Sequence, residues 1–148
     1  MADSTDEANE TATLTLSNAA NASISDATGT LTITDDDNAP LLSINDVTAS
    51  NENAANATFT ATLSAASGKA VTVDYASSNG TATAGADYTA SSGTLTFAAG
   101  ETSKTFTVPV LADSTDEANE TATLTLSNAA NATISDATGT LTLSLIHI

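Results

Sequence analysis

The chain has 148 residues, of which 18 are acidic and only two, Lys69 and Lys104, are basic, giving a net charge of −16. This charge excludes electrostatic attraction to nucleic acids and to anionic membrane surfaces, and it favours divalent cations as partners. Cysteine is absent and no apolar run is long enough to cross a bilayer, so we expect neither disulfides nor direct membrane insertion.

Alternation of apolar residues with threonine and other polar residues predicts β-strands along most of the chain. The alternating runs lie near residues 57–63, 71–75, 95–97, 106–110 and 121–127. A period of two places one face of a strand against a core and the other in water. Turn signals separate the runs, at Ser25-Asp26, Ser67-Gly68, Asn79-Gly80, Gly93 and Ala99-Gly100. This pattern predicts an all-β fold, an immunoglobulin-like antiparallel β-sandwich of about seven strands.

A long internal repeat is the strongest feature of the sequence. Residues 2–32 recur as residues 112–142, an offset of 110 (112 minus 2), and only Ser23 differs from its counterpart Thr133. The offset is a domain length, so it indicates a tandem repeat of small domains. We expect residues 1–37 to be the C-terminal part of a truncated module and residues 38–142 to be a nearly complete module. The truncated part is expected to form a hairpin that is disordered, docked on the full module or paired with another chain.

The two copies diverge after residue 142. The first continues through Ile33 and Thr34 to Asp35, Asp36 and Asp37, whereas the second continues as Leu-Ser-Leu-Ile-His-Ile. This segment, residues 143–148, resembles the translation of a sequencing adapter, and we interpret it as an assembly artefact. It contains His147, the only histidine, which we therefore do not expect to be a metal ligand or a catalytic base.

Residues 71–129 resemble the Calx-beta domain family throughout. The shared motifs follow the family order: V-D-Y at 73–75, G-T-A-x-A-G-x-D-Y at 80–88, G-T-L-x-F at 93–97, G-E-T at 100–102 and E-T-x-T-L at 120–124. The acidic stretch before the last motif and the closing Asp run at 35–37 complete the pattern. The resemblance implies a calcium-binding β-sandwich like those of sodium–calcium exchangers, an integrin subunit and long bacterial surface or secreted proteins. The repeated, cysteine-free sequence looks like the bacterial kind.

The resemblance also implies a set of calcium ligands. In the complete module the matching positions are Glu52, Asp87, Asp113, Glu117 and Glu120. In the truncated part they are Asp3, Glu7, Glu10, Asp35, Asp36 and Asp37. Calcium accepts six to eight oxygens from several loops, and without it close carboxylate pairs repel each other by about 1 kcal/mol or more. Each of the two sites lacks part of the set, so we expect this chain to bind calcium more weakly than an intact array.

Simpler roles are open for each of these acids. The Asp run at 35–37 is also compatible with a solvated linker, and Asp87 with a turn residue that bonds its own backbone. Glu117 and Glu120 are compatible with plain surface charges. Tyr75 and Tyr88 are expected to pack in the core.

The sequence offers no catalytic arrangement, because arginine and cysteine are absent and the one histidine lies in the divergent tail. We expect a non-enzymatic calcium-binding spacer in a bacterial adhesin-like protein, secreted or membrane-associated at the cell surface. Its partners would be neighbouring modules and calcium ions. One alternative is a module that recognises a glycan or a protein. A second is ice binding through the rows Thr11, Thr13, Thr15 and Thr121, Thr123, Thr125.

Overall fold

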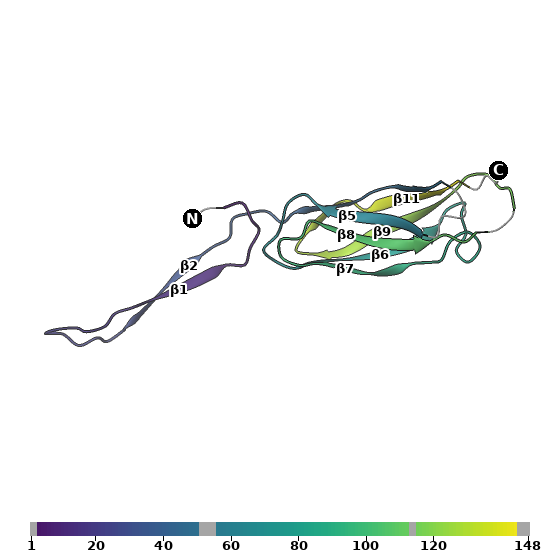
Figure 1. The fold of residues 1–148 in the computed structure, drawn as a ribbon. Coiled ribbons are helices and arrows are strands. Elements are labelled where there is room, and N and C mark those ends of the chain that lie inside the picture. Colours follow the sequence, from purple (N-terminus) through teal and green to yellow (C-terminus); the bar gives the residue numbers. More distant parts are fainter. Residues whose placement is uncertain (1–2, 51–55, 113–114, 145–148) are drawn as a thin grey trace.

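The computed structural model describes residues 3–50, 56–112 and 115–144, and all the regular structure in these ranges is β-strand. Strands β3 to β11 form a sandwich that holds the hydrophobic core. A separate hairpin of β1 (Glu10–Thr15) and β2 (Thr28–Ile33) extends away from one end of the sandwich (Figure 1). The described ranges contain no helix suited to spanning a membrane.

Two sheets make up the sandwich. The first has the order β10-β3-β5-β8, with bounds Thr133–Asp136, Leu41–Ile44, Asn56–Leu63 and Ser103–Pro109. The second has the order β4-β11-β9-β6-β7, with bounds Val47–Ala49, Thr138–Leu143, Glu120–Ala130, Val71–Asn79 and Ser92–Phe97. Strands β10 and β3 pair in parallel, as do β11 and β4, and the other pairings are antiparallel.

The core follows the alternation in the sequence. Along β5, Ala57, Phe59, Ala61 and Leu63 are buried, and the residues between them face outward. Phe106 of β8 stacks on Phe59 and on Tyr75, with ring centroids 5.5 Å and 4.0 Å apart. Tyr88 is fully buried, so the predicted packing role of both tyrosines is confirmed. Apolar burial of this kind is the main term that stabilises the sandwich.

The predicted immunoglobulin-like β-sandwich is confirmed, and the structure explains why its described residues form nine strands instead of about seven. Two segments change sheet halfway along their length: β3 continues as β4 after Asn45-Asp46, and β10 continues as β11 after Ala137. Counting each broken strand once gives seven. The Asn45 side chain accepts a bond from the Thr60 amide, and the Asp46 side chain accepts one from the Thr140 amide, both 2.8 Å long. These polar side chains satisfy backbone donors where the strand changes sheet.

The predicted turn at Gly93 is wrong. Gly93 lies inside β7, directly opposite Tyr75 of β6. A Cβ atom at this position would lie 2.9 Å from the Tyr75 hydroxyl oxygen, so the glycine makes room for the aromatic ring. The other four turn signals fall between strands or at a strand end.

The long strands define two poles of the sandwich. Strands β6 and β9 run antiparallel, with Asn79 opposite Ala122 at one end and Thr72 opposite Ala130 at the other. We call the first end the tail pole and the second the head pole. At about 3.3 Å per residue, the nine residues of β6 separate the poles by about 30 Å. The hairpin projects from the head pole (Figure 1).

The hairpin is well paired but solvated. Its register runs from Glu10 opposite Ile33 to Thr15 opposite Thr28, and every residue of its two strands is exposed. In the sandwich the counterpart of Ile33 is Leu143, which completes β11 and is only 1% exposed. The proposed artefactual origin of residues 143–148 stays a prediction, and His147 lies outside the described residues.

Candidate metal centre

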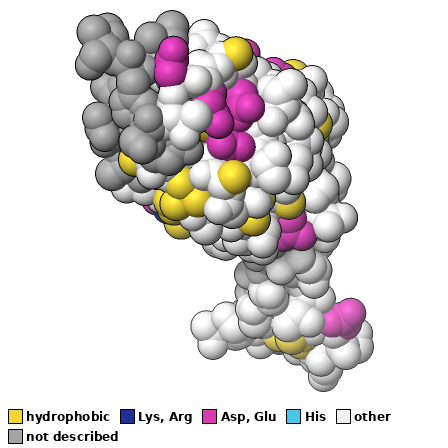
Figure 2. Space-filling view, turned by 90° about the vertical axis from the view of Figure 1, so that its right-hand side faces the viewer, with side chains coloured by type: hydrophobic (Ala, Val, Ile, Leu, Met, Phe, Trp, Pro, Cys, Tyr) yellow, Lys and Arg dark blue, Asp and Glu magenta, His cyan; other side chains and the backbone are white. Residues whose placement is uncertain are grey.

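Three carboxylates meet at the tail pole. Asp87 comes from the loop between β6 and β7, Glu117 from the segment before β9, and Glu120 is the first residue of β9. One carboxylate oxygen from each lies within 4.8 Å of the other two. Acidic side chains gather on this end of the sandwich in Figure 2. We call Asp87, Glu117 and Glu120 the tail cluster.

The loop that carries Asp87 is held by a set of short hydrogen bonds. Asn79 Oδ1 accepts bonds from the Ala84 amide at 2.9 Å and from the Tyr88 hydroxyl at 2.7 Å. The Thr83 amide donates to Asp87 Oδ2 at 2.6 Å, and the Asp87 amide donates back to the Thr83 carbonyl at 2.9 Å. Asp87 therefore uses one oxygen in its own turn, as the simpler interpretation predicted, and it also contributes an oxygen to the cluster.

Close packing between this loop and β9 brings Glu120 to Asp87. The Ala82 amide donates to the Thr121 carbonyl at 2.9 Å, and the Thr121 amide donates to Thr81 Oγ1 at 2.8 Å. A Cβ atom at Gly80 would collide with the same Thr121 carbonyl oxygen. The glycine of the G-T-A motif is thus needed for the close approach of two backbones, which fixes the spacing of the carboxylates.

The electrostatics of the cluster favour a bound cation. Glu120 Oε2 is buried and has no hydrogen-bond partner among the described residues. Burial, followed by the charges of Asp87 and Glu117, raises the pKa of the Glu120 carboxyl. A buried carboxylate oxygen without a partner is costly. An oxygen-only donor set suits a hard divalent cation such as Ca²⁺ better than zinc or copper, which prefer nitrogen and sulfur. The residues present therefore fit calcium.

A second group of acids gathers at the junction of the hairpin and the head pole. It lines an open cavity of about 340 Å³ together with Ala8, Ile33 and Thr34. Its members, which we call the head cluster, are Asp3, Glu7, Glu10, Asp35, Asp36 and Asp37. The charge of Asp3 and then burial raise the pKa of Glu7, while burial and then the charge of Asp36 raise the pKa of Asp37. Repulsion is thus present here too.

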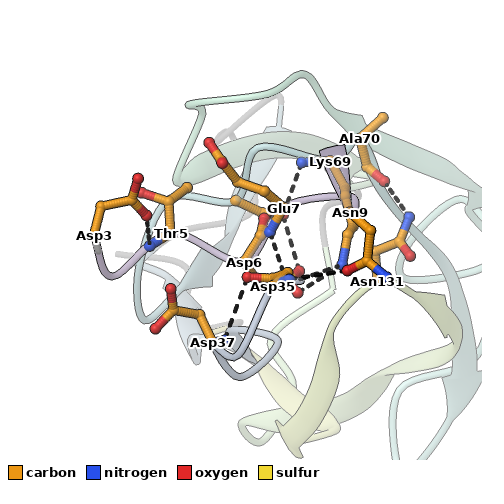
Figure 3. Close-up of polar contacts among 11 residues, drawn as sticks. Asp3, Thr5, Asp6, Glu7, Asn9, Asp35, Asp37, Lys69, Ala70 and Asn131 are labelled. Atoms are coloured by element: carbon orange, nitrogen blue, oxygen red, sulfur yellow. Dashed lines mark hydrogen bonds and ion pairs between the residues drawn. The ribbon is translucent and has the colours of Figure 1, made fainter. Parts of the chain in front are cut away.

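The structure sorts the predicted ligands into these two groups at opposite poles. The first holds Asp87, Glu117 and Glu120, and the second holds Asp3, Glu7, Glu10, Asp35, Asp36 and Asp37. The predicted ligands Glu52 and Asp113 lie outside the described residues. Asp35 is engaged already, because its side chain accepts bonds from the Glu7 amide at 3.1 Å and the Asp37 amide at 3.3 Å (Figure 3).

Sequence reasoning missed two polar residues at the head pole, Asp6 and Lys69. Lys69 Nζ lies 2.7 Å from Asp6 Oδ1, and Asp6 is only 6% exposed (Figure 3). The sequence signal that could have pointed to Lys69 is the scarcity of basic side chains. One of only two lysines directly follows a Ser-Gly turn in a chain with 18 acids. Nothing in the strand pattern linked that turn to Asp6, which lies more than 60 positions away.

Fold and site together describe a β-sandwich with an acidic pole suited to a hard cation. A profile of the Calx-beta domain matches residues 35–144, so the chain belongs to the Calx-beta domain family and the resemblance is confirmed. No curated protein sequence matches the chain.

Solved structures support the same fold. The apo form of the Calx CBD1 domain superposes with a TM-score of 0.68 at 19% identity, over 73% of this chain and 98% of that domain. The CBD12 structure from CALX1.2 gives 0.66 at 21% identity, over 70% of this chain and 44% of that one. The Calx CBD2 domain gives 0.63 at 14% identity, over 70% of this chain and 85% of that domain. At these identities the likeness concerns the fold alone.

Proposed function

We propose that this chain is a calcium-binding module that acts as a rigid spacer in a long adhesin-like protein on a bacterial surface or in its secretions. The observation that carries the calcium part is the tail cluster, in which three carboxylates converge and Glu120 Oε2 is buried with no hydrogen-bond partner among the described residues. A divalent cation would neutralise this charge and supply the missing contact. The relatives add support, since one solved structure that matches is described as a calcium binding domain of CALX1.1.

The spacer part is supported by how the module is built. Its two poles are separated by the length of its longest strands, and each pole carries acidic residues from the same repeated sequence. The head cluster lies where one copy of the repeat meets the next module, so an ion there would restrain the joint. Near-identical copies suit a role in which each unit contributes the same length.

Calcium binding is tested by melting the full chain in EDTA and in millimolar calcium, with magnesium as the ionic control. Ligand binding to the folded state should raise the melting temperature in calcium, and isothermal titration should detect heat. Asp87→Asn should reduce the rise, whereas Asp26→Asn, an exposed hairpin residue outside both clusters, should not. No heat and no rise in calcium would remove the basis of the proposal.

Spacer behaviour is tested by small-angle scattering from a chain of several modules. Calcium should narrow the distribution of end-to-end lengths relative to EDTA. Identical flexible profiles in the two buffers would contradict calcium stiffening even if each module binds calcium.

A further inference from the structure

The turn between β5 and β6 holds a segment from the preceding copy of the repeat. Asp6 and Ser67 form a parallel β-bridge, and the Gly68 amide donates to the Asp6 carbonyl at 2.9 Å. Ser67 Oγ lies 3.2 Å from both the carbonyl oxygen and Oδ2 of Asp6. Lys69 Nζ bonds Asp6 Oδ1 at 2.7 Å. Both carboxylate oxygens and the carbonyl oxygen of Asp6 are thus occupied by three consecutive residues of the turn.

Packing around the turn is close and leaves Asp6 and Ser67 buried, at 6% and 2% exposure. A Cβ atom at Gly68 would lie 2.8 Å from Glu7 Cγ, so a larger residue here would displace the Glu7 side chain. The Lys69 ammonium also lies 3.7 Å from Oδ2 of Asp35, which follows the second strand of the hairpin (Figure 3). Charge-assisted bonds at buried positions are stronger than exposed ion pairs.

Lys69 differs from the other lysine, which forms its ion pair within its own strand and turn. Lys104 pairs with Glu101, three residues earlier on the same module, at 2.8 Å. Lys69 instead reaches out of the sandwich to carboxylates of the segment before residue 38. The hydrogen bond from Lys69 is the main cause that lowers the pKa of Asp6, and the same bond raises the pKa of Lys69. Both groups are therefore charged at neutral pH.

Because of the repeat, the complete module carries its own equivalent of Asp6. Asp6 corresponds to Asp116 (6 plus 110), and residues 3–15 are identical to residues 113–125. Asp116 is exposed and lies in the segment before β9, at the tail pole, whereas Lys69 precedes β6 at the head pole. One module thus presents the acceptor turn at one end and the matching acidic segment at the other. Complementary, non-identical patches at opposite ends generate a linear assembly.

We propose that the turn Ser67-Gly68-Lys69 is a docking site for the acidic segment of the preceding module. Asp116 would bind in the same way to the equivalent turn of a following copy. We call this contact the clasp. It uses the array of the proposed function but none of its calcium, because its bonds join protein groups directly. The clasp therefore holds successive modules together in metal-free solution as well, and it fixes which end of one module meets which end of the next.

The first test uses hydrogen exchange of the full chain in EDTA, read at the Gly68 amide, whose acceptor is the Asp6 carbonyl. Lys69→Gln and Asp6→Asn should each speed exchange at Gly68 by about tenfold or more. Lys104→Gln and Asp116→Asn are the matched controls and should leave it unchanged. Unchanged exchange at Phe59 in β5 would show that the variants keep the sandwich folded. Equal protection of Gly68 in wild type, Lys69→Gln and Asp6→Asn would overturn the clasp.

The second test extends the chain by appending residues 34–144 after Leu143. The appended unit carries its own core, since all the core residues in the described ranges lie from Leu42 to Leu143. In this longer chain Asp116→Asn should now speed exchange of the glycine equivalent to Gly68 in the appended copy, again by about tenfold or more. No effect of Asp116→Asn would refute the proposed binding of Asp116 to the turn of the following copy. Because both tests are run in EDTA, their failure is distinguishable from a failure of calcium stiffening.

Discussion

Leu14 and Leu124 occupy the same position in the two copies of the repeat, yet Leu14 is 63% exposed and Leu124 is fully buried. Their neighbours in sequence are identical, and both lie in β-strands. Strand β9 is covered because it pairs with β6 and β11 and faces the opposite sheet, whereas among the described strands β1 pairs with β2 alone. Local sequence thus determines the strand, and its neighbours in the fold determine the energy that each leucine contributes.

Leu124→Ala and Leu14→Ala should therefore differ sharply in stability. Truncating a buried leucine removes apolar burial and leaves a cavity, so Leu124→Ala should lower the free energy of unfolding by about 2–5 kcal/mol. Leu14→Ala should change it by less than about 0.5 kcal/mol. Urea unfolding followed by circular dichroism measures both values. Similar effects of the two substitutions would show that the hairpin contributes to the same cooperative unit as the sandwich.

Gly29 and Gly139 form a second pair at equivalent positions. A Cβ atom at Gly139 would collide with the carbonyl oxygen of Asn45, while no atom of the described residues lies within 4 Å of one at Gly29. Gly139→Ala should force β11 away from the strand switch at Asn45, lowering the free energy of unfolding by about 1–3 kcal/mol. Gly29→Ala should be close to neutral. Thermal melts of the two variants beside wild type test this, and a harmless Gly139→Ala would mean that the switch can relax.

Sequence predicted well those features that depend on local patterns. The five alternating runs all correspond to strands, and the asparagines of the repeat show that some backbone conformations are set locally as well. Asn18 and Asn128 have φ of 54° and 51°, and Asn21 and Asn131 have 58° and 59°, although one copy is solvated and the other packed. Asparagine tolerates the left-handed region, so each of these residues adopts it in either environment.

Features that depend on distant contacts were not predictable in this way. Strands β3, β4 and β10 have only three or four residues each, too few for a period of two to be recognised. Gly93 has the sequence signature of a turn, and its strand conformation reflects the Tyr75 ring on the neighbouring strand. The grouping of Asp87, Glu117 and Glu120 was expected from the family resemblance. The bond between Asp6 and Lys69 was not, because no local pattern relates them.

Glu120→Gln should have opposite effects with and without calcium. In EDTA the wild type carries a buried Glu120 oxygen that no described residue hydrogen-bonds, next to two other acids, and the amide removes that charge. The variant should therefore gain about 1 kcal/mol, which corresponds to a rise of about 4–8 °C in melting temperature for a domain of this size. In millimolar calcium the neutral ligand should bind the ion less well, so the calcium-induced rise should shrink.

The matched control for these opposite effects on melting temperature is Glu101→Gln. It removes an acid that pairs with Lys104 away from both clusters. This control should lack both the gain in EDTA and the loss of calcium response. If Glu120→Gln melts at the same temperature as wild type in EDTA, the Glu120 carboxylate is not destabilising the folded protein. The tail cluster then loses its main support as a metal site.

Asp74 provides a prediction about pH that is separate from both acidic clusters. It lies on β6 between two donors, Thr94 Oγ1 at 2.6 Å and Asn128 Nδ2 at 3.1 Å. These bonds, that from Thr94 first, lower the pKa of Asp74 below its ordinary value of 3.8. A carboxyl with a lowered pKa contributes stability that is present above about pH 4 and is lost as the pH falls through the folded value.

Asp74→Asn should therefore be less stable than wild type at pH 7, because a neutral amide oxygen accepts hydrogen bonds from Thr94 and Asn128 more weakly than a carboxylate does. The difference between the two proteins should shrink as the pH falls below about 4, since the wild-type carboxylate is then protonated as well. Urea unfolding in EDTA at a series of pH values measures the difference directly, and the relief of the overall negative charge at low pH is common to both proteins. A difference that stays constant down to pH 2 would mean that the bonds to Thr94 and Asn128 do not favour the charged form.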